Sequence, residues 1–505
     1  YHLGFPLDDA WIHQTYARNL VEYGQWAFIP GQPSAGSTAP LWSALLAIGH
    51  ALRLGPYIWT FFVGWLTLWA LSVVGYYGFR ILAPAHGKWA LWAALGLALE
   101  WHLVWAAGSG METLLFALVI LIALVWLAGA MSGENENPDL SEGIAPDPIF
   151  QASSPCPEPR RRVPTFHFSR SWLGLGALVG LSVWLRPDGV TLLGPVGFVL
   201  LMGSQGWQKK FRLALIFILG FLIFAMPYLV FNRALAGSWW PNTFYAKQAE
   251  YAILRRLPLW QRYLNELILP AVGAGALLVP GFMYALYRAI RYRSWPILAA
   301  GLWTLGYAAM YAGRLPVTYQ HGRYLVPAMP VFFLIGFLGT AELLKLDTQV
   351  AWRRVMSRVW IAALGAVLGL FWVIGARTYA DDVAIIESEM VSTATWVAHN
   401  TPPDALIAAH DIGALGYFGH RDLLDLAGLV SPEVIPFIRD EMALERYLDA
   451  QNADYLVTFP DWYPLLSSKG ERIFQANGQY SPAQGGENMA VYRWHSRSMT
   501  GQSHY

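Results

Sequence analysis

Two adjacent carboxylates near the start of the chain, Asp8 and Asp9, are the first residues that could carry chemistry. They come directly before a helical pattern over residues 10–23, whose Trp11 and Tyr16 we expect to lie along a membrane interface. An aspartate there would cap free helix amides, but a cap requires only one carboxylate. Paired carboxylates at one site serve proton transfer or bind a cation. We therefore predict a general base at this pair and keep a divalent cation as the alternative, although no His or Cys cluster demands a metal.

Three cations in separate loops, Arg186, Lys247 and Arg323, form the second candidate group. Guanidinium and ammonium groups bind phosphate oxygens strongly, so we predict that the three bind the phosphate of a lipid. Each also has a simpler interpretation. Arg186 would pair with Asp188 in its own hairpin. Lys247 would extend to the membrane interface, and Arg323 would bond loop carbonyls.

Six further polar residues are candidate substrate-binding residues: Glu112, Asn242, Tyr245, His321, His410 and Asp411. Glu112 could equally cap the helix that follows it. His410 and Asp411 stand at the end of a predicted strand, where we expect them to contact an acceptor.

The elements that must position these residues are membrane spans. Hydrophobic residues make up 55% of the 505 residues and charged residues only 13%, whereas a soluble globule carries about a quarter charged residues. Long apolar runs are each sufficient to cross a bilayer as a helix. We predict an α-helical polytopic membrane protein with ten spans in this chain, at about 56–80, 89–107, 112–132, 171–187, 189–207, 211–231, 267–288, 294–313, 324–344 and 357–376.

Loop charges predict the orientation of these spans. Lys and Arg accumulate in cytoplasmic loops. One set of alternate loops carries sixteen Lys and Arg and the other carries eight, so the first set is predicted to be inside. Ten spans then place residues 1–55 and 377–505 outside, facing the periplasm or the cell exterior. An N-terminus reaches that side most simply through one preceding span, which predicts eleven spans in the intact protein; a cleaved signal peptide is the alternative.

Three regions follow from this topology. Residues 1–55 form an exterior loop with an interfacial helix that carries the double Asp, and residues 56–376 form the transmembrane domain. Within that domain, the Pro-rich stretch 133–168 is predicted to be a disordered cytoplasmic linker. Residues 377–505 carry 8 Lys and Arg against 17 Asp and Glu. Alternating helical and extended patterns there predict a C-terminal soluble α/β domain.

Several motifs, in their order along the chain, resemble those of a known family. They are Asp8-Asp-Ala-Trp-Ile with Tyr16-Ala-Arg-Asn-Leu20, Gly110-Met-Glu-Thr113, Arg186-Pro-Asp-Gly189, Pro241-Asn-Thr-Phe-Tyr-Ala-Lys247 and Gly322-Arg-Tyr324, followed by His410-Asp-Ile-Gly-Ala-Leu-Gly-Tyr-Phe418. The set resembles the GT-C superfamily of membrane glycosyltransferases, which use polyprenyl-phosphate sugars. It is most similar to the bacterial branch that contains the terminal arabinofuranosyltransferases.

The resemblance implies an inverting glycosyltransferase that moves a sugar from a polyprenyl-phosphate donor to an acceptor hydroxyl on the exterior face. An Asp of the pair would be the general base, and the three cations would stabilise the leaving phosphate. No cofactor is required. The partners would be the donor, a glycan, lipid or protein acceptor, and the bilayer, with no nucleic acid. Two other functions stay open: a catalytically inert membrane assembly subunit, and a lipid or sugar transporter with ionisable residues at mid-membrane.

Overall fold

The computed structural model describes residues 3–134, 172–346 and 348–495. Of the predicted linker 133–168, only residues 133 and 134 are described, and they end helix α6. The rest of that linker, with Cys156, lies outside the described residues.

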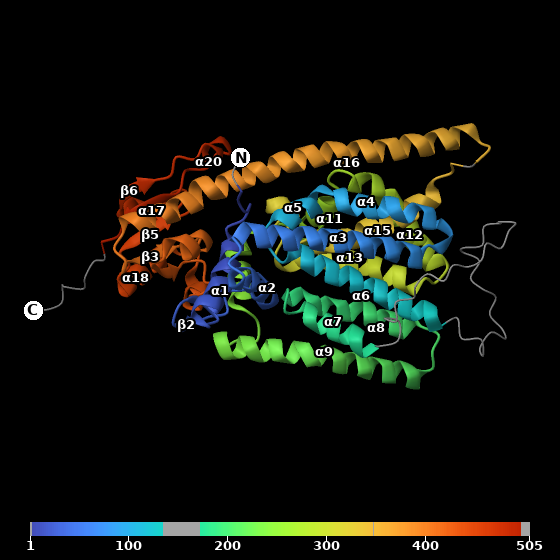
Figure 1. The fold of residues 1–505 in the computed structure, drawn as a ribbon, viewed down its shortest axis with the longest axis horizontal. Helices are drawn as coiled ribbons and strands as arrows, with labels where there is room; N and C mark the ends of the chain where they lie inside the picture. Colours follow the sequence, from blue (N-terminus) through green and yellow to red (C-terminus); the bar gives the residue numbers. More distant parts are fainter. Residues whose placement is uncertain (1–2, 135–171, 347, 496–505) are drawn as a thin grey trace, which may run out of the picture.

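A bundle of apolar helices makes up the larger part of the described chain (Figure 1). Its elements are α3 (Pro56–Leu82), η1 (Pro84–Trp89), α4 (Ala90–Leu99), α5 (Trp101–Gly108), α6 (Thr113–Glu134), α7 (Trp172–Ser182), η5 (Pro187–Leu192), α8 (Leu193–Met202), α9 (Trp207–Ala236), α11 (Leu259–Ile268), η7 (Leu269–Ala271), α12 (Gly275–Arg291), α13 (Trp295–Arg314), α14 (Tyr319–Gly322), η8 (Val326–Ala328), α15 (Met329–Leu343) and α16 (Ala351–Ile385).

The predicted number of ten spans is not confirmed. Among the described residues, five helices are long and apolar enough to cross a membrane, or up to seven if two bent helix pairs each form one span. The pair α4 and α5 bends by 51°, and the pair that includes α11 and α12 bends by 108°. The first bend lies at Glu100, whose backbone leaves the helical conformation with φ −67° and ψ 122°, while its side chain accepts a hydrogen bond from the amide of Leu103 and caps α5. Helix α7 and the segment Pro187–Met202 are apolar but short.

Glycines allow the helices to approach closely. A Cβ built on Gly176 of α7 would lie 2.0 Å from the carbonyl oxygen of Phe217 on α9. A Cβ on Gly339 of α15 would lie 1.8 Å from the carbonyl oxygen of Gly281 on α12. Small residues at such crossings are typical of membrane helix packing, where van der Waals contact drives association.

A layer of short elements covers the end of the bundle that meets the sheet (Figure 1). It comprises α1 (Asp9–Tyr23), β1 (Ala27–Ile29), β2 (Gln32–Pro33) and α2 (Pro40–Ala51). The expectation that α1 lies along a membrane interface is wrong. Trp11 and Tyr16 are fully buried, and the Trp11 ring packs 4.8 Å from that of Tyr417 and 4.6 Å from that of Phe418. The apolar side chains of α1 are thus covered by other parts of the protein, the C-terminal region among them, instead of by lipid.

A five-stranded sheet forms the core of the C-terminal region, which confirms a sheet-containing region there. The strands are β3 (Leu406–Ala409), β4 (Asp422–Asp425), β5 (Tyr455–Thr458), β6 (Glu471–Gln475) and β7 (Ala490–Arg493), in the order β4-β3-β5-β7-β6. Strand β3 pairs in parallel with β4 and β5, while β7 pairs antiparallel with β5 and β6. The short helical elements around it are η10 (Leu415–Gly419), η11 (Pro432–Phe437), α18 (Glu441–Gln451), α19 (Pro464–Lys469) and α20 (Tyr480–Ala483).

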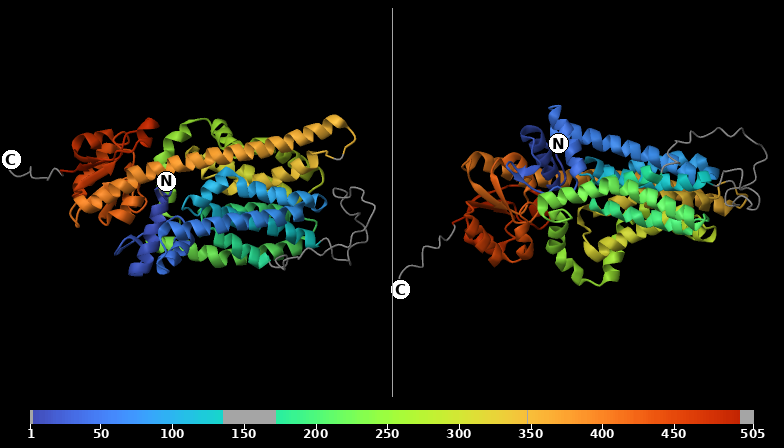
Figure 2. Two further views of the ribbon diagram at one scale, coloured as in Figure 1. Left: turned by 45° about the horizontal axis from the view of Figure 1, so that its top comes forward. Right: turned by 90° about the horizontal axis from the view of Figure 1, so that it is seen from below.

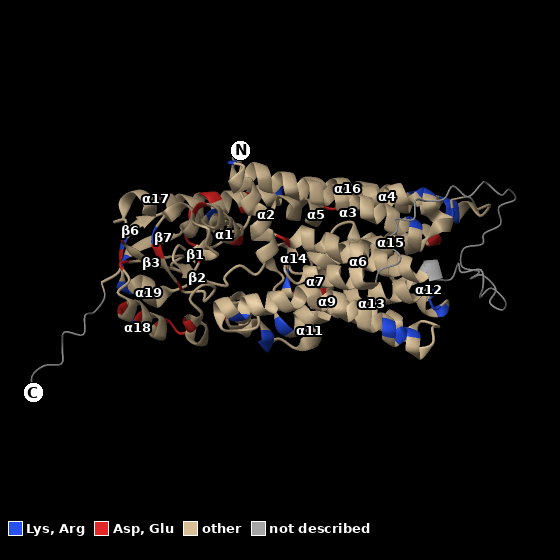
Figure 3. Cartoon of the chain, turned by 60° about the horizontal axis from the view of Figure 1, so that its bottom comes forward, with Lys and Arg blue, Asp and Glu red and all other residues tan. Residues whose placement is uncertain are grey.

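One long helix joins the bundle to the sheet (Figure 2). Helix α16 continues through a π-helical turn, η9 (Ile386–Val391), into α17 (Ser392–Asn400). Position 377, the predicted start of the exterior domain, lies inside α16. Lys and Arg gather at the end of the bundle opposite the sheet, around the end of α12 and the start of α16 (Figure 3). This distribution agrees with the charge bias on which the predicted orientation rests.

Candidate functional site

Asp9 is held between two of the predicted cations. Its Oδ2 atom lies 2.9 Å from Nζ of Lys247 and 2.7 Å from Nη2 of Arg323. Asp9 opens α1, Lys247 stands on α10 (Asn242–Glu250), and Arg323 follows α14. Burial alone would favour the neutral acid, but Lys247 and Arg323 hold the pKa of Asp9 well below its usual range. Asp9 is therefore a carboxylate at neutral pH.

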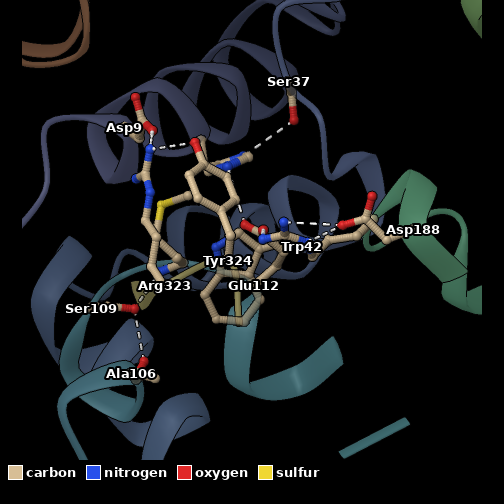
Figure 4. A network of polar contacts seen from close by, with 12 residues as sticks. Asp9, Ser37, Trp42, Ala106, Ser109, Glu112, Asp188, Arg323 and Tyr324 are labelled. Carbon is tan, nitrogen blue, oxygen red and sulfur yellow. Dashed lines mark hydrogen bonds and ion pairs between the residues drawn. The ribbon is translucent and has the colours of Figure 1, made fainter. Parts of the chain in front are cut away.

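All three predicted cations surround one aromatic ring, that of Tyr324. The ring centroid lies 5.0 Å from Cζ of Arg323, 5.6 Å from Cζ of Arg186 and 5.9 Å from Nζ of Lys247. The Tyr324 hydroxyl accepts a hydrogen bond from Nη2 of Arg323 at 3.1 Å. Figure 4 shows Tyr324 beside Arg323 and Asp9. Three separate loops thus bring their positive charges to one place, as the sequence predicts.

Arg186 has partners that the other two cations lack. Its Nη1 donates to Oε1 of Glu112 at 3.2 Å, and its Nη2 donates to Asp188 at 3.1 Å and to the hydroxyl of Tyr311 at 2.8 Å. The predicted pairing with Asp188 is therefore present, and Glu112 is a second acidic partner. Arg323 differs because its Nε and Nη1 are buried and have no hydrogen-bond partner in the part of the chain that the structure describes.

A small cavity lies among these groups. Its volume is about 110 Å³, and it is lined by Asp9, His13, Glu112, Arg186, Asp188, Thr243, Phe244, Lys247, Gln248, Tyr311, Arg314, Arg323 and Tyr324, among others. Arg314 is a cation that the sequence analysis did not select. Its guanidinium lies 3.5 Å from the ring centroid of Phe244, and it forms no ion pair within the described part of the chain. Four Lys and Arg side chains face three carboxylates here, so the cavity suits an anion.

Asp8 turns away from this cavity toward the C-terminal region. Its two carboxylate oxygens accept hydrogen bonds from the backbone amides of Gly413, at 2.7 Å, and Ala414, at 2.8 Å. Its side chain makes no cap to α1. Burial and the nearby Asp411 raise the pKa of Asp8 to about 8, although the two amides oppose this shift. The two adjacent aspartates therefore serve different partners.

A larger cleft opens on the other side of Asp9. Its volume is about 990 Å³, and it runs between the bundle and the C-terminal region. His410 and Asp411 line it, as do Asp8, Asp9, Lys247 and Arg323. His410 lies 3.5 Å from Glu250 of α10, and Glu250 and Tyr463 raise the pKa of His410 although burial opposes this. Burial raises the pKa of Asp411 to about 6. Asp9, Lys247 and Arg323 stand where the cavity and the cleft meet.

Three predicted substrate-binding residues face neither space. Asn242 is buried at the start of α10, and Tyr245 is 40% exposed beside the ring of Phe244. On that helix Thr243, Phe244, Lys247 and Gln248 face the cavity instead. His321 pairs with Asp382 at 2.7 Å.

Comparison with known proteins assigns the fold. A protein-family model described as a domain of unknown function (DUF8728) matches residues 381–499. No curated protein matches the sequence. The crystal structure of ArnT from Cupriavidus metallidurans in the apo state has a TM-score of 0.59 at 14% identity, covering 97% of this chain and 94% of that chain. ArnT bound to undecaprenyl phosphate gives 0.53 at 16% identity over the same shares.

A second solved protein is similar to this chain in fold. The oligosaccharyltransferase of Archaeoglobus fulgidus has a TM-score of 0.60 at 13% identity, covering 94% of this chain and 69% of that chain. Both proteins are GT-C glycosyltransferases. The chain has the GT-C fold. Arabinofuranosyltransferase AftD from Mycobacteria matches 98% of this chain and 40% of that chain at 16% identity, with a TM-score of 0.45, so the branch within the GT-C fold stays a proposal.

His13, like Arg314, lines the cavity and was not selected by the sequence analysis. Its Nε2 lies 3.6 Å from Oε2 of Glu112, and its Nδ1 lies 3.0 Å from the hydroxyl of Ser43. Burial lowers the pKa of His13, although Glu112 opposes this. The sequence could have indicated His13, because it follows Asp9 by four positions and residues four apart share one helix face.

The geometry does not favour the alternative of a divalent cation at Asp8 and Asp9. Within residues 3–134, 172–346 and 348–495, no group of three or more His, Cys, Asp or Glu side chains is placed to hold a metal ion. An ion shared by Asp8 and Asp9 would have to displace the amides of Gly413 and Ala414 from one carboxylate and two cations from the other.

Proposed function

We propose that this protein is an inverting glycosyltransferase that moves a sugar from a polyprenyl-phosphate donor to an acceptor hydroxyl on the exterior face of a bacterial cytoplasmic membrane. The observation that carries the proposal is the Asp9 carboxylate, paired with Lys247 and Arg323 where a cation-rich cavity meets a large cleft. One space can take the donor phosphate and the other the acceptor.

The donor phosphate would bind at Lys247 and Arg323. Among the described residues, Lys247 and Arg323 share one carboxylate oxygen, and two nitrogens of Arg323 are buried without an acceptor. A phosphate has enough oxygens to satisfy them. The solved complex of ArnT, a protein of the same fold, with undecaprenyl phosphate supports this class of ligand. Arg186 would contribute its charge from across the Tyr324 ring.

Asp9 would then act as the general base, and donor binding would activate it. Before binding, the two cations make the carboxylate a weak base, because they favour its ionised form. A phosphate that takes up both cations weakens their hold on Asp9 and raises its proton affinity. The acceptor hydroxyl gives its proton to Asp9 as its oxygen attacks the anomeric carbon. The bond from that carbon to the phosphate oxygen breaks, and the two cations stabilise the departing phosphate. One direct displacement inverts the anomeric centre.

The acceptor would enter through the cleft. The cleft is lined from the C-terminal region by His410, Asp411 and Trp462, so that region would bind the acceptor. This acceptor is a glycan, a lipid or a protein with a free hydroxyl. The motifs favour an enzyme of the arabinofuranosyltransferase-like branch.

A transfer assay tests the function directly. Proteoliposomes that contain the purified full chain would receive a panel of radiolabelled polyprenyl-phosphate pentoses and hexoses, with envelope fragments as acceptors. Label that appears in the acceptor supports the proposal. Label that only crosses the bilayer would indicate a transporter, and label that stays in the donor on its original side would indicate an inert assembly subunit. The variant Asp9→Asn separates enzymatic transfer from contamination, because it removes the proposed base.

The proposed orientation has its own test. Thiols engineered at Gln451, which is exposed in the C-terminal region, should react in intact cells with a reagent that cannot cross the membrane. A thiol at Gln208, exposed at the start of α9, should react only after the cells are opened. The reverse pattern would contradict the orientation.

A further inference from the structure

We propose that Asp8 is a positioning residue, which holds the loop at residues 410–414 of the C-terminal region against α1 and so fixes the acceptor cleft relative to Asp9. Its role in the reaction rests on the proposed glycosyl transfer, but the contact itself does not. The two adjacent aspartates then have different roles. Asp8 aligns the C-terminal region with α1, and Asp9 contacts the substrates.

The contact between Asp8 and the loop is specific on both sides. Each carboxylate oxygen accepts one backbone amide, at 2.7 Å from Gly413 and 2.8 Å from Ala414, across 405 and 406 positions of the chain. Backbone amides cannot move away as a flexible side chain can. The site is also tight, because a Cβ built on Gly413 would lie 2.1 Å from the carbonyl oxygen of Asp8. Only glycine fits this approach.

Further contacts continue the same attachment along α1. Trp11 packs on the rings of Tyr417 and Phe418. Arg18 donates to the carbonyl oxygens of Tyr417 at 2.7 Å and Gly416 at 3.1 Å. Helix α1 therefore presents one set of side chains to the segment after β3, while Asp9 and His13 line the cation-rich cavity. A single helix links the C-terminal region to the proposed base.

The loop that Asp8 holds is also part of the cleft. His410 and Asp411 line the cleft, and they precede Gly413 and Ala414 by only a few residues. An acceptor bound to these side chains would have its hydroxyl placed relative to Asp9 through Asp8. Transfer is sensitive to such placement, because an error of about 1 Å in the position of a reacting group can cost about 100-fold in rate.

Two variants weaken the contact from opposite sides. Asp8→Asn replaces one accepting oxygen by an NH₂ group that faces a backbone donor, and Gly413→Ala introduces the excluded Cβ. Asp404→Asn is the matched control, since Asp404 is an exposed carboxylate of the same C-terminal region. All are made in the full chain in lipid nanodiscs.

The first measurement needs no substrate. Hydrogen exchange at the amides of Gly413 and Ala414 should be at least tenfold faster in Asp8→Asn than in the unmodified protein or Asp404→Asn. Unchanged exchange would overturn the proposed contact, whether or not the protein transfers sugar.

The second measurement separates positioning from chemistry. With a labelled polyprenyl-phosphate sugar that supports transfer, both transfer to the acceptor and slow hydrolysis by water are followed. In Asp8→Asn and Gly413→Ala the ratio of transfer to hydrolysis should fall at least tenfold while hydrolysis continues, because water needs no aligned cleft. In Asp9→Asn both reactions should fall together. An equal fall of both reactions in Asp8→Asn, with amide exchange unchanged, would make Asp8 part of the chemistry and overturn the proposal. Absence of transfer by the unmodified protein would defeat the proposed function alone, and amide exchange would still decide the role of Asp8.

Discussion

Asp9 and Lys247 lie 238 positions apart in the chain, yet Nζ of Lys247 is 2.9 Å from Oδ2 of Asp9. The contact closes α10 over the start of α1, and it is an ion pair that an incoming phosphate would have to share. Side chains on both partners are partly exposed, at 20% for Lys247 and 25% for Asp9, so a ligand can reach them. The pair therefore joins α10 to α1 and is also open to a ligand.

The proposed base gives the first prediction. Asp9→Asn should reduce transfer by about 10²–10⁴-fold, because the acceptor hydroxyl loses its proton acceptor. Initial rates with a labelled donor provide the measurement. Asp404→Asn should retain the full rate, because Asp404 is exposed and lines neither the cavity nor the cleft. Full activity in Asp9→Asn would remove the base assignment.

The donor site gives the second prediction. Lys247→Gln and Arg323→Gln should each weaken binding of a polyprenyl phosphate that lacks the sugar, by about 1.5–3 kcal/mol for a lost charge-assisted contact. Isothermal titration in nanodiscs measures this affinity. Arg255→Gln is the matched control because Arg255 is exposed outside the cavity. Equal affinities in all four proteins would contradict a phosphate site at these residues.

Arg186 should respond differently from the other two cations. Its removal leaves Glu112 and Asp188 without their cation, and both are largely buried, with side-chain exposures of 2% and 13%. Arg186→Gln should therefore lower the free energy of unfolding by about 3–5 kcal/mol, in addition to any effect on the donor. Thermal unfolding in detergent measures the loss. The double variant Arg186→Gln with Glu112→Gln should recover part of it, and a single variant as stable as the unmodified protein would show that the pairing is weak.

Helix packing gives the fourth prediction. Gly176→Ala should destabilise the contact of α7 with α9, since the added Cβ would meet the carbonyl oxygen of Phe217 at 2.0 Å. A loss of about 1–3 kcal/mol is expected from such overpacking. Gly197→Ala on α8 is the control, because a Cβ built there meets no described atom within 4 Å apart from its chain neighbours and the backbone of its own helix. Equal melting temperatures for the two variants would contradict the close approach.

The ion pair of His410 with Glu250 predicts a pH dependence of stability. The pKa of His410 is raised above 6.5, so its contribution is fully present below pH 6.5 and is lost as the pH rises through the raised pKa. The pKa of Glu250 is lowered from 4.5, since His410 and Lys247 outweigh the opposing effect of burial; its contribution is present above pH 4.5 and is lost as the pH falls through the lowered pKa. The unmodified protein should therefore exceed Glu250→Gln in stability most clearly between pH 4.5 and 6.5, and the difference should shrink at alkaline pH. A difference that does not change from pH 5 to 10 would exclude the pair as its source.

Much of this architecture could be predicted because apolar run length and motif order are local properties. All ten predicted span ranges overlap helices in the described residues, but apolar run length alone does not reveal the bend at Glu100. Strands β4 and β6 are hard to recognise in the sequence, because their four and five residues lack a clear alternating pattern. The meeting of Lys247 with Arg323 was predicted, and the separation of Asp8 from Asp9 was not. Two adjacent residues at a helix start can point to different partners. The partner of Asp8 is Gly413, which is distant in the sequence, so the sequence alone does not indicate the contact.

The uninterrupted helix from the bundle to the sheet has a mechanical consequence. Residues 351–400 form one helical stretch of 50 residues, roughly 75 Å long at about 1.5 Å per residue, with a π-helical turn near the sheet. In such a continuous helix, any change in length also changes the rotation of one end relative to the other. Removing one residue below the π-helical turn would rotate the sheet by about 100° about the helix axis as well as lower it by about 1.5 Å. The number of residues in this helix therefore sets the rotational position of the C-terminal region over the cleft, and changes in helix length would be tolerated only near whole multiples of the helical repeat.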